Sequence, residues 1–335
     1  MTDVPGLLVG NAENVKIRTG VTVVLPEKPA VCGIDIRGGA PGTRDTDASD
    51  PTCLADAVDA VVLSGGSAFG LDAAGGVMSW LTARGRGYPI GKAVVPIVPS
   101  AILFDLSNGG DKDWGDSPPY RSLGILACDK AHDHIALGNA GAGFGATVGF
   151  ALPKQMSGGL GSASFVLDAE DDRPNVTVAA LAAVNPVGDV LIPETDAFWA
   201  WPFEQAGEFG ERRPKPGWAQ APFDDRYPGE VIGNTTLVVI ATDAALTKAQ
   251  AKRVAIMAHD GIARAIRPVH TPFDGDATFV LSTGRVHLRD PLPDLARIGS
   301  LAADCTARAI ARGVYEANDL DPIRSYRSLY PNAKP

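Results

Sequence analysis

The chain has 335 residues, of which 45% are hydrophobic and 21% charged, so it can build a sizeable core. Its formal net charge of −9 argues against a nucleic-acid partner, because phosphate binding needs a basic surface. No apolar run approaches the length that spans a membrane, and the N-terminus has no signal-peptide pattern. We therefore expect a cytoplasmic protein with no membrane partner.

The cysteines argue against a metal centre. Cys32, Cys53, Cys128 and Cys305 are scattered, without the paired spacing of a metal site or a disulfide framework. We expect buried free thiols in a reducing compartment. No phosphate-binding motif follows the early glycine pair either, so neither a metal nor a cofactor is predicted.

Short apolar runs bounded by turn residues predict several strands. They cover residues 21–25, 30–36, 94–98, 158–167 and 175–184. Residues 57–63 form a further apolar run, and the glycine pair after it opens a helix at residues 73–81. The run at 175–184 is apolar throughout, which indicates a strand buried on both faces. The length is compatible with a single large α/β domain.

Three other segments are irregular. Residues 107–120 are polar and rich in glycine and proline, which predicts a surface loop. Residues 196–227 combine prolines with aromatic residues and are predicted to be an exposed linker. Residues 138–149 contain five glycines, which indicates either a close-packed crossing or a wall of backbone amides that could form an oxyanion hole.

The clearest periodicity lies in the last third of the chain. Thr247 and Gln250 form a capping box, which marks the start of a helix. Its apolar face comprises residues 254, 257, 258, 261, 262 and 265. His259 lies on the opposite side and is predicted to be a surface residue. Pro268 ends the helix, and residues 301–315 predict a final one.

The stretch with the most chemical content is Gly233-Asn234-Thr235-Thr236, which runs directly into the apolar strand of residues 237–241. Our hypothesis is that Thr235 Oγ attacks the Asn234 carbonyl and the chain cuts itself there. The freed Thr235 would carry a nucleophilic hydroxyl group and an α-amine that titrates near neutral pH and acts as its base. The alternative is an ordinary turn or cap before a strand.

Two other stretches place polar side chains at strand ends. Asn185 follows the buried run at 175–184; it either caps a turn with Pro186 or polarises a substrate carbonyl. Asp274 and Asp276 flank a glycine just before a predicted strand, so both carboxylates can point into one site. The alternative is an acidic turn or a weak cation site, although the ligands of a calcium-binding loop are missing.

Five segments of the chain occur in the order seen in the self-processing L-aminopeptidase/D-esterase family of N-terminal nucleophile hydrolases, which this chain resembles. They are residues 64–71, residues 138–149, Asn185-Pro186, Gly233-Asn234-Thr235-Thr236 and Asp274-Gly275-Asp276. Within the family, Asn-Thr-Thr and Asp-Gly-Asp are more similar to the endo-type 6-aminohexanoate-oligomer (nylon-oligomer) hydrolases than to the β-aminopeptidases, which use Ser. The similarity covers nearly the whole chain.

The resemblance implies an α/β fold, a four-layer α/β/β/α sandwich. It also implies a single catalytic domain, residues 1–335, that is cut into an α-chain of residues 1–234 and a β-chain of residues 235–335, and a homotetramer. The implied activity is hydrolysis of small peptide or amide substrates through an acyl-Thr235 ester, without metal or cofactor.

The same resemblance assigns roles to individual residues. Thr235 is the nucleophile, and Asn185 is the amide that orients the substrate or the oxyanion. Asp274 and Asp276 hold the α-amine of the nucleophile. A carboxylate beside that amine raises its pKa, so burial must offset this effect if the amine is to act as a base.

Two positions depart from the family pattern. The nylon-oligomer branch has a Lys shortly after the glycine-rich run, where this sequence has Phe150, and the nearest lysine is Lys154. Either Lys154 reaches the site through a different loop, or its role is lost. Relatives with a Tyr in the segment before the 107–120 loop have a hydroxyl donor where this chain has Phe104.

Two rival functions share these features. One is an acyltransferase of the ornithine acetyltransferase kind, which also cuts itself before a Thr but passes the acyl group to an amine. The other is a binding protein of the same fold that never cuts itself.

Overall fold

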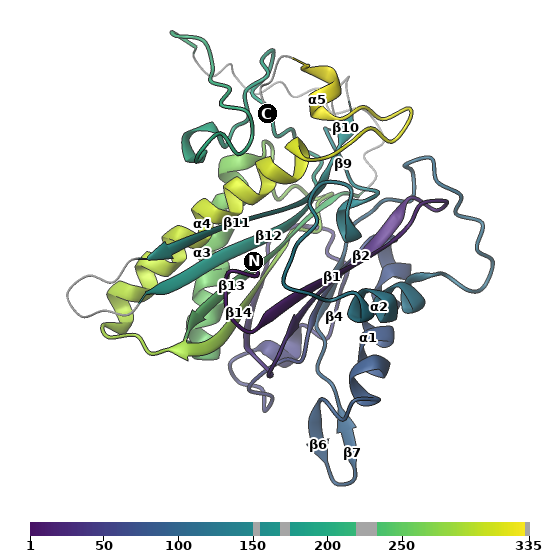
Figure 1. The fold of residues 1–335 in the computed structure, drawn as a ribbon, viewed down its shortest axis with the longest axis vertical. Coiled ribbons are helices and arrows are strands. Elements are labelled where there is room, and N and C mark those ends of the chain that lie inside the picture. Colours follow the sequence, from purple (N-terminus) through teal and green to yellow (C-terminus); the bar gives the residue numbers. More distant parts are fainter. Residues whose placement is uncertain (150–154, 168–174, 219–232, 332–335) are drawn as a thin grey trace.

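Two five-stranded sheets form the framework of the protein (Figure 1). The computed structural model describes residues 1–149, 155–167, 175–218 and 233–331. The first sheet has the strand order β1 (Leu7–Asn14), β2 (Thr19–Pro26), β5 (Val61–Ser64), β8 (Ser100–Ile102) and β4 (Thr43–Arg44). The second has the order β11 (Gly159–Leu167), β12 (Val176–Asn185), β13 (Thr235–Ala244), β14 (Ala277–Val286) and β3 (Val31–Ile36).

Helices cover the outer face of each sheet (Figure 1). On the first sheet lie α1 (Asp72–Thr82) and α2 (Tyr120–Asp129). On the second lie α3 (Lys248–Ala265) and α4 (Pro291–Tyr315), with the short α5 (Tyr326–Leu329) at the end of α4. A third apolar cluster, which includes Leu63, Leu181 and Phe279, fills the space between the sheets. The α/β/β/α sandwich expected from the sequence is therefore confirmed.

The continuous apolar runs form the centre of the second sheet. All residues of β12 and β13 are buried, because a sheet lies on one side of them and helices on the other. The predicted capping box is present at Thr247, whose side chain accepts from Gln250 N, and α3 begins there. The helix α4 begins ten residues before the predicted start, because Pro291 is compatible with the first turn of a helix.

Two predictions for individual segments were wrong, and one helix was not predicted. Of the expected strand at 94–98, only the first two residues are in a strand, β7 (Ala93–Val95), which forms a small exposed hairpin with β6 (Tyr88–Ile90). The helix α2 starts where the predicted surface loop ends and was not expected. Within the expected linker, Phe198 and Phe209 are fully buried against each other, and Phe198 also contacts Tyr326. This part of the segment is a packed loop, held by its aromatic residues.

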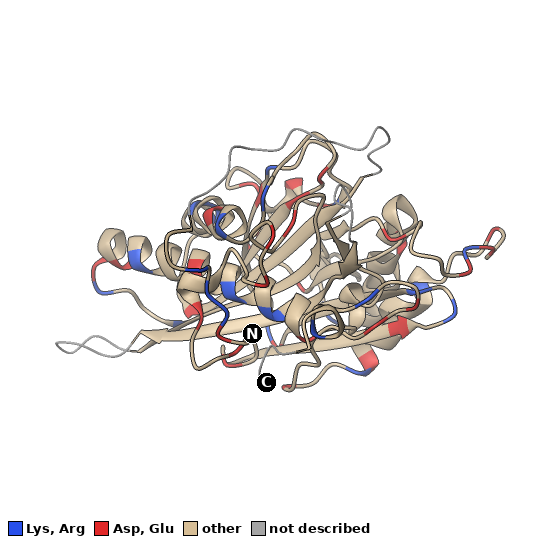
Figure 2. Cartoon of the chain, turned by 90° about the horizontal axis from the view of Figure 1, so that it is seen from above, with Lys and Arg blue, Asp and Glu red and all other residues tan. Residues whose placement is uncertain are grey.

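The short pair β9 (Thr147–Val148) and β10 (Met156–Ser157) lies at the edge of the second sheet. Figure 2 shows Lys and Arg positions interspersed with Asp and Glu positions along the helices and loops, while the strands carry few of either. In the part of the chain that the structure describes, no helix is both apolar and long enough to cross a membrane.

Candidate active site

The three polar stretches singled out in the sequence meet at one edge of the second sheet. Asn185 ends β12 and lies directly opposite Thr235, the first residue of β13. Because β13 and β14 are parallel, their N-terminal ends lie together, and Asn234 pairs with Asp274 just before them. These residues and Asp276 are all at most 3% exposed.

The peptide bond between Asn234 and Thr235 is the centre of this cluster. Thr235 Oγ donates a hydrogen bond of 2.6 Å to the carbonyl oxygen of Asn234. The backbone amide of Gly275 donates to the same oxygen at 2.8 Å. This carbonyl oxygen therefore accepts from two donors, the Gly275 amide and the hydroxyl group of Thr235.

Asn234 is itself fixed on both sides. Its backbone N–H donates to Phe273 O at 3.1 Å, and its side-chain Nδ2 donates to Pro186 O at 2.9 Å. A methyl group at Gly275 would lie 2.5 Å from Thr235 Oγ and 2.9 Å from Ala40 O. Only a glycine at this position leaves room for the hydroxyl group of Thr235.

Asn185 lies opposite Thr235, and two hydrogen bonds fix its side chain. Its side chain is fully buried; Oδ1 accepts from Thr147 N at 2.8 Å, and Nδ2 donates to Phe104 O at 3.0 Å. An amide nitrogen carries two hydrogens, so one N–H remains for a further acceptor. Phe104 thus contributes its carbonyl oxygen to the site. Lys154 lies outside the described residues.

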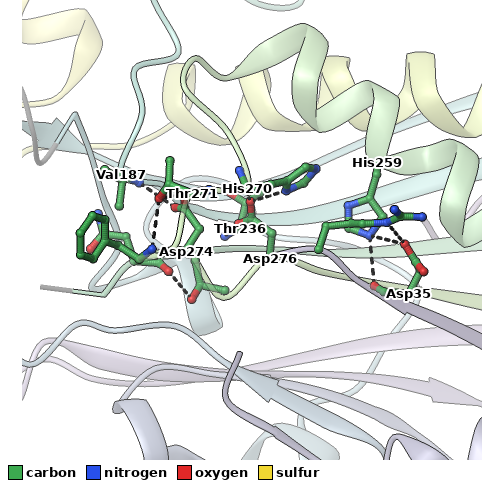
Figure 3. A network of polar contacts seen from close by, with 12 residues as sticks. Asp35, Val187, Thr236, His259, His270, Thr271, Asp274 and Asp276 are labelled. Atoms are coloured by element: carbon green, nitrogen blue, oxygen red, sulfur yellow. Dashed lines mark hydrogen bonds and ion pairs between the residues drawn. The ribbon is translucent and has the colours of Figure 1, made fainter. Parts of the chain in front are cut away.

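Asp274 is held by neutral donors (Figure 3). Its Oδ1 accepts from Val187 N at 3.1 Å, and its Oδ2 accepts from the backbone N at 2.9 Å and from Oγ1 at 2.6 Å of Thr271. Burial, and then the negative charge of Asp276, raise the pKa of Asp274 to about 6.

Asp276 has a different set of partners (Figure 3). Its Oδ1 accepts from Thr236 N at 2.7 Å, one residue beyond the proposed nucleophile. Its Oδ2 accepts from His270 Nδ1 at 2.7 Å and from His270 N at 3.2 Å. In the uncut chain, the hydrogen bonds that Asp274 and Asp276 accept therefore come from groups other than the Thr235 nitrogen.

The prediction that His259 lies on the surface was wrong. The residue is 4% exposed, because this side of α3 packs against β3. His259 Nε2 lies 3.1 Å from Asp35 O, and its ring packs edge-on against that of His270, with 4.9 Å between centroids. Burial is the main reason why the pKa of His259 is lowered to about 4, so its ring is neutral at pH 7.

The glycine-rich run at residues 138–149 is a close-packed crossing between the two sheets. A side chain at Gly143 would lie 2.2 Å from Leu160 N in β11. The amide of Gly141 donates to Glu13 Oε1 at 2.6 Å, and that of Ala142 donates to Thr22 Oγ1 at 2.9 Å. These two amides are used within the protein and do not face a ligand.

Two residues with direct contacts to the site were given no role in the sequence analysis. Gly275 stood only as the spacer between the two aspartates, and His270 lies in the same short stretch. The loop after β3 also supports the stretch, since the Gly38 amide donates to Asp276 O and the Ala40 amide to Asp274 O. In the described residues, no group of three or more His, Cys, Asp or Glu side chains could hold a metal ion.

Comparison with known proteins identifies the family. The model of the family described as "Peptidase family S58" matches residues 1–326. The chain belongs to peptidase family S58. An uncharacterised aminopeptidase of Mycobacterium tuberculosis (strain ATCC 25618 / H37Rv) is 42% identical over 354 residues, which cover 99% of this chain and 98% of the relative. The family resemblance noted in the sequence is therefore confirmed.

Two further similarities support this assignment. A 6-aminohexanoate-oligomer endohydrolase of Kocuria sp. (strain KY2) is 29% identical over 308 residues, or 91% of this chain and 80% of that protein. The L-aminopeptidase D-Ala-esterase/amidase of Ochrobactrum anthropi, described as a variant of the Ntn hydrolase fold, superimposes with a TM-score of 0.70. That match has 19% identity and covers 99% of this chain and 94% of the other. S58 membership makes the protein an amide-bond hydrolase, as predicted.

Proposed function

We propose that this S58 protein is a self-processing amide hydrolase whose nucleophile is the hydroxyl group of Thr235. The observation that carries the proposal is the geometry at one peptide bond. Thr235 Oγ lies 2.6 Å from the Asn234 carbonyl oxygen, which also accepts a bond of 2.8 Å from the Gly275 amide. A nucleophile and an oxyanion donor are thus aimed at the same carbonyl group.

The first reaction is the cut. Thr235 Oγ attacks the carbonyl carbon of Asn234, and the Gly275 N–H stabilises the negative charge that develops on its oxygen. The hydroxyl proton passes to the Thr235 nitrogen as the C–N bond breaks, which leaves an ester between the two residues. Water hydrolyses the ester. Residues 1–234 then end in a carboxylate, residues 235–335 begin with a free α-amine, and the two remain one catalytic domain.

The second reaction is turnover. The α-amine of Thr235 takes the proton from Oγ as the oxygen attacks a substrate amide, and passes it to the leaving amine. Water then hydrolyses the acyl-Thr235 ester. The free N–H of Asn185 would bind the substrate oxygen, while Asp274 and Asp276 would hold the amine. The charges of the two aspartates raise the pKa of the amine and burial lowers it, so the strength of the amine as a base depends on both effects.

The cut would also open the site. In the uncut chain the Thr235 nitrogen is an amide without basicity, and the residue is 3% exposed. Withdrawal of Asn234 removes the group that occupies the position of a substrate carbonyl beside Oγ. Hydrolysis is therefore expected only after processing.

The substrate class is proposed from the relatives. Their names as aminopeptidases and 6-aminohexanoate-oligomer endohydrolases support small peptides, or amides of ω- or β-amino acids, as substrates. We expect a homotetramer in the cytoplasm, and light scattering after size-exclusion chromatography measures the assembly. The Lys154→Ala variant tests whether that lysine contributes to processing.

The experiment is to purify the chain and follow it by denaturing electrophoresis, mass spectrometry and N-terminal sequencing. Two fragments, the smaller of which starts at Thr235, are the expected result, with amide hydrolysis that grows as they appear. A single full-length chain after long incubation contradicts the proposal and favours a binding protein. Faster acyl transfer to amino acids than to water favours the acyltransferase.

A further inference from the structure

The two buried aspartates beside the scissile bond differ in their partners. Asp274 accepts only from neutral groups, the Val187 amide and the amide and hydroxyl of Thr271. Asp276 also accepts from an imidazole, that of His270, at 2.7 Å. Since an ionised carboxylate can only accept, His270 Nδ1 must carry a hydrogen in this contact.

We propose that His270 is a positioning residue, which holds the Asp276 carboxylate turned toward the start of β13. This inference rests on the proposed function of Thr235 and adds a component to it. The ring and the amide of His270 both contact Asp276 Oδ2, while Oδ1 accepts from Thr236 N, one residue beyond the proposed nucleophile.

The backbone conformation of His270 brings two of its nitrogens to the same carboxylate oxygen. The residue has a φ of 54°, a left-handed conformation in which its own amide and its ring nitrogen both reach Asp276 Oδ2. Residues other than glycine seldom adopt this conformation, although asparagine, aspartate and histidine do so more often than the rest. The side chain is therefore held in place by the turn and not only by packing.

Asp276 pairs with His270 and not with the other histidine nearby. The neighbour of His270, His259 from α3, is kept neutral by burial, and the Nε2 of that ring is directed at Asp35 from β3. Asp35 is in turn paired with the guanidinium of Arg37. Of the charged groups named here, Asp276 is the one in direct contact with His270.

Removal of the His270 side chain is expected to slow the cut and not only to destabilise the fold. Without the ring, Asp276 Oδ2 loses one of its contacts, so the carboxylate that accepts from Thr236 N is less firmly held. A side chain with only a structural role would lower the thermal midpoint without slowing the cut.

The test compares His270→Gly with His270→Asn. Both residues tolerate the left-handed backbone, but only Asn keeps an N–H close to the position of Nδ1. We expect the Gly variant to cut itself roughly ten- to a hundredfold more slowly, as for a lost hydrogen bond to a charged group. Asn should restore most of the rate. His287→Asn, at an exposed residue after β14, is the matched control.

Equal rates in the Gly variant and the wild type overturn the inference, and so do equally slow Gly and Asn variants. If Thr235→Ala still cuts itself, the proposed function has failed, whatever the His270 variants do. A second readout does not depend on the cut: the NMR signal of the His270 imidazole in the chain as purified. Asp276→Asn should shift this signal, and an unchanged signal refutes the pairing.

Discussion

Each of the two sheets buries a carboxylate at a strand end, but only the one in the second sheet lies close to the Asn234–Thr235 peptide bond. Asp105 follows β8 in the first sheet, where it accepts from Thr19 Oγ1 at 2.6 Å and from Gly66 N at 2.8 Å. Asp276 precedes β14 in the second sheet, with Asp274 two residues before it. Burial raises the pKa of Asp105 and is also the main cause of the raised pKa of Asp274.

The comparison teaches that a buried carboxylate is not by itself the mark of a catalyst. Asp105 joins the start of β2 to the turn after β5, and its neighbour Phe104 contributes a carbonyl oxygen to Asn185. The first sheet thus supports the site through its backbone. The second sheet supplies the side chains and the polarised carbonyl group, so changes in the two sheets should have different effects.

The largest effect is expected for Thr235→Ala. If the hydroxyl group is the nucleophile, the variant should remain a single chain and lose hydrolysis by at least about 10³-fold, as in other nucleophile deletions. Electrophoresis and an amidase assay measure both losses, and circular dichroism checks the fold. Cleavage at the same bond in this variant would refute the assignment, whereas Thr235→Ser should retain part of both activities.

Gly275→Ala should have the second largest effect on the reaction. Its methyl group would lie 2.5 Å from Thr235 Oγ and would displace the amide from the Asn234 carbonyl. We expect the cut to slow by about 10²–10³-fold, the usual cost of a lost oxyanion donor. Gly233→Ala is the matched control, because a methyl group there meets nothing closer than Phe273 O at 3.4 Å. Equal rates of fragment appearance in the two variants would contradict the role of Gly275.

The protonation of Asp274 should make the unfolding free energy depend on pH. Its pKa is raised from 3.8 to about 6 in the folded chain, so the stabilisation is complete below pH 3.8 and is lost as the pH rises through 6. At 1.36 kcal/mol per pKa unit, the loss is about 3 kcal/mol. In uncut Thr235→Ala, the unfolding free energy should fall more between pH 4 and 7 than in Thr235→Ala/Asp274→Asn. Asp189 has a pKa raised to about 6 but is present in both chains, so its contribution cancels.

Much of the second sheet could be predicted, because its central strands contain continuous apolar runs bounded by polar residues. Those polar ends identified Asn185, Thr235 and the two aspartates as a site. Gly275 and His270 could not be assigned a role, since each acts through a contact that exists only once β13 and β14 lie side by side.

The wrong predictions have physical reasons of the same kind. His259 lies opposite the apolar face of α3, but that side of the helix packs against β3, and a polar ring there finds Asp35 as a partner. The helix α2 carries Gly124 in its middle and directly follows a Gly- and Pro-rich loop, so it gave no helical signal. In both cases the partner element, and not the local sequence, decides the environment.

The smallest effect on the reaction is expected for Asp105→Asn. Asn can accept through Oδ1 alone, so either Thr19 or Gly66 loses its acceptor, which costs about 1–3 kcal/mol of unfolding free energy. The rate of the cut should stay within about twofold of the wild type, because the hydrogen bonds at Asn234 and Thr235 are unchanged. Denaturant unfolding of uncut Thr235→Ala/Asp105→Asn measures the first effect, and the time course of Asp105→Asn measures the second. A strong loss of processing in a stably folded Asp105→Asn chain would mean that the first sheet takes part in the chemistry itself.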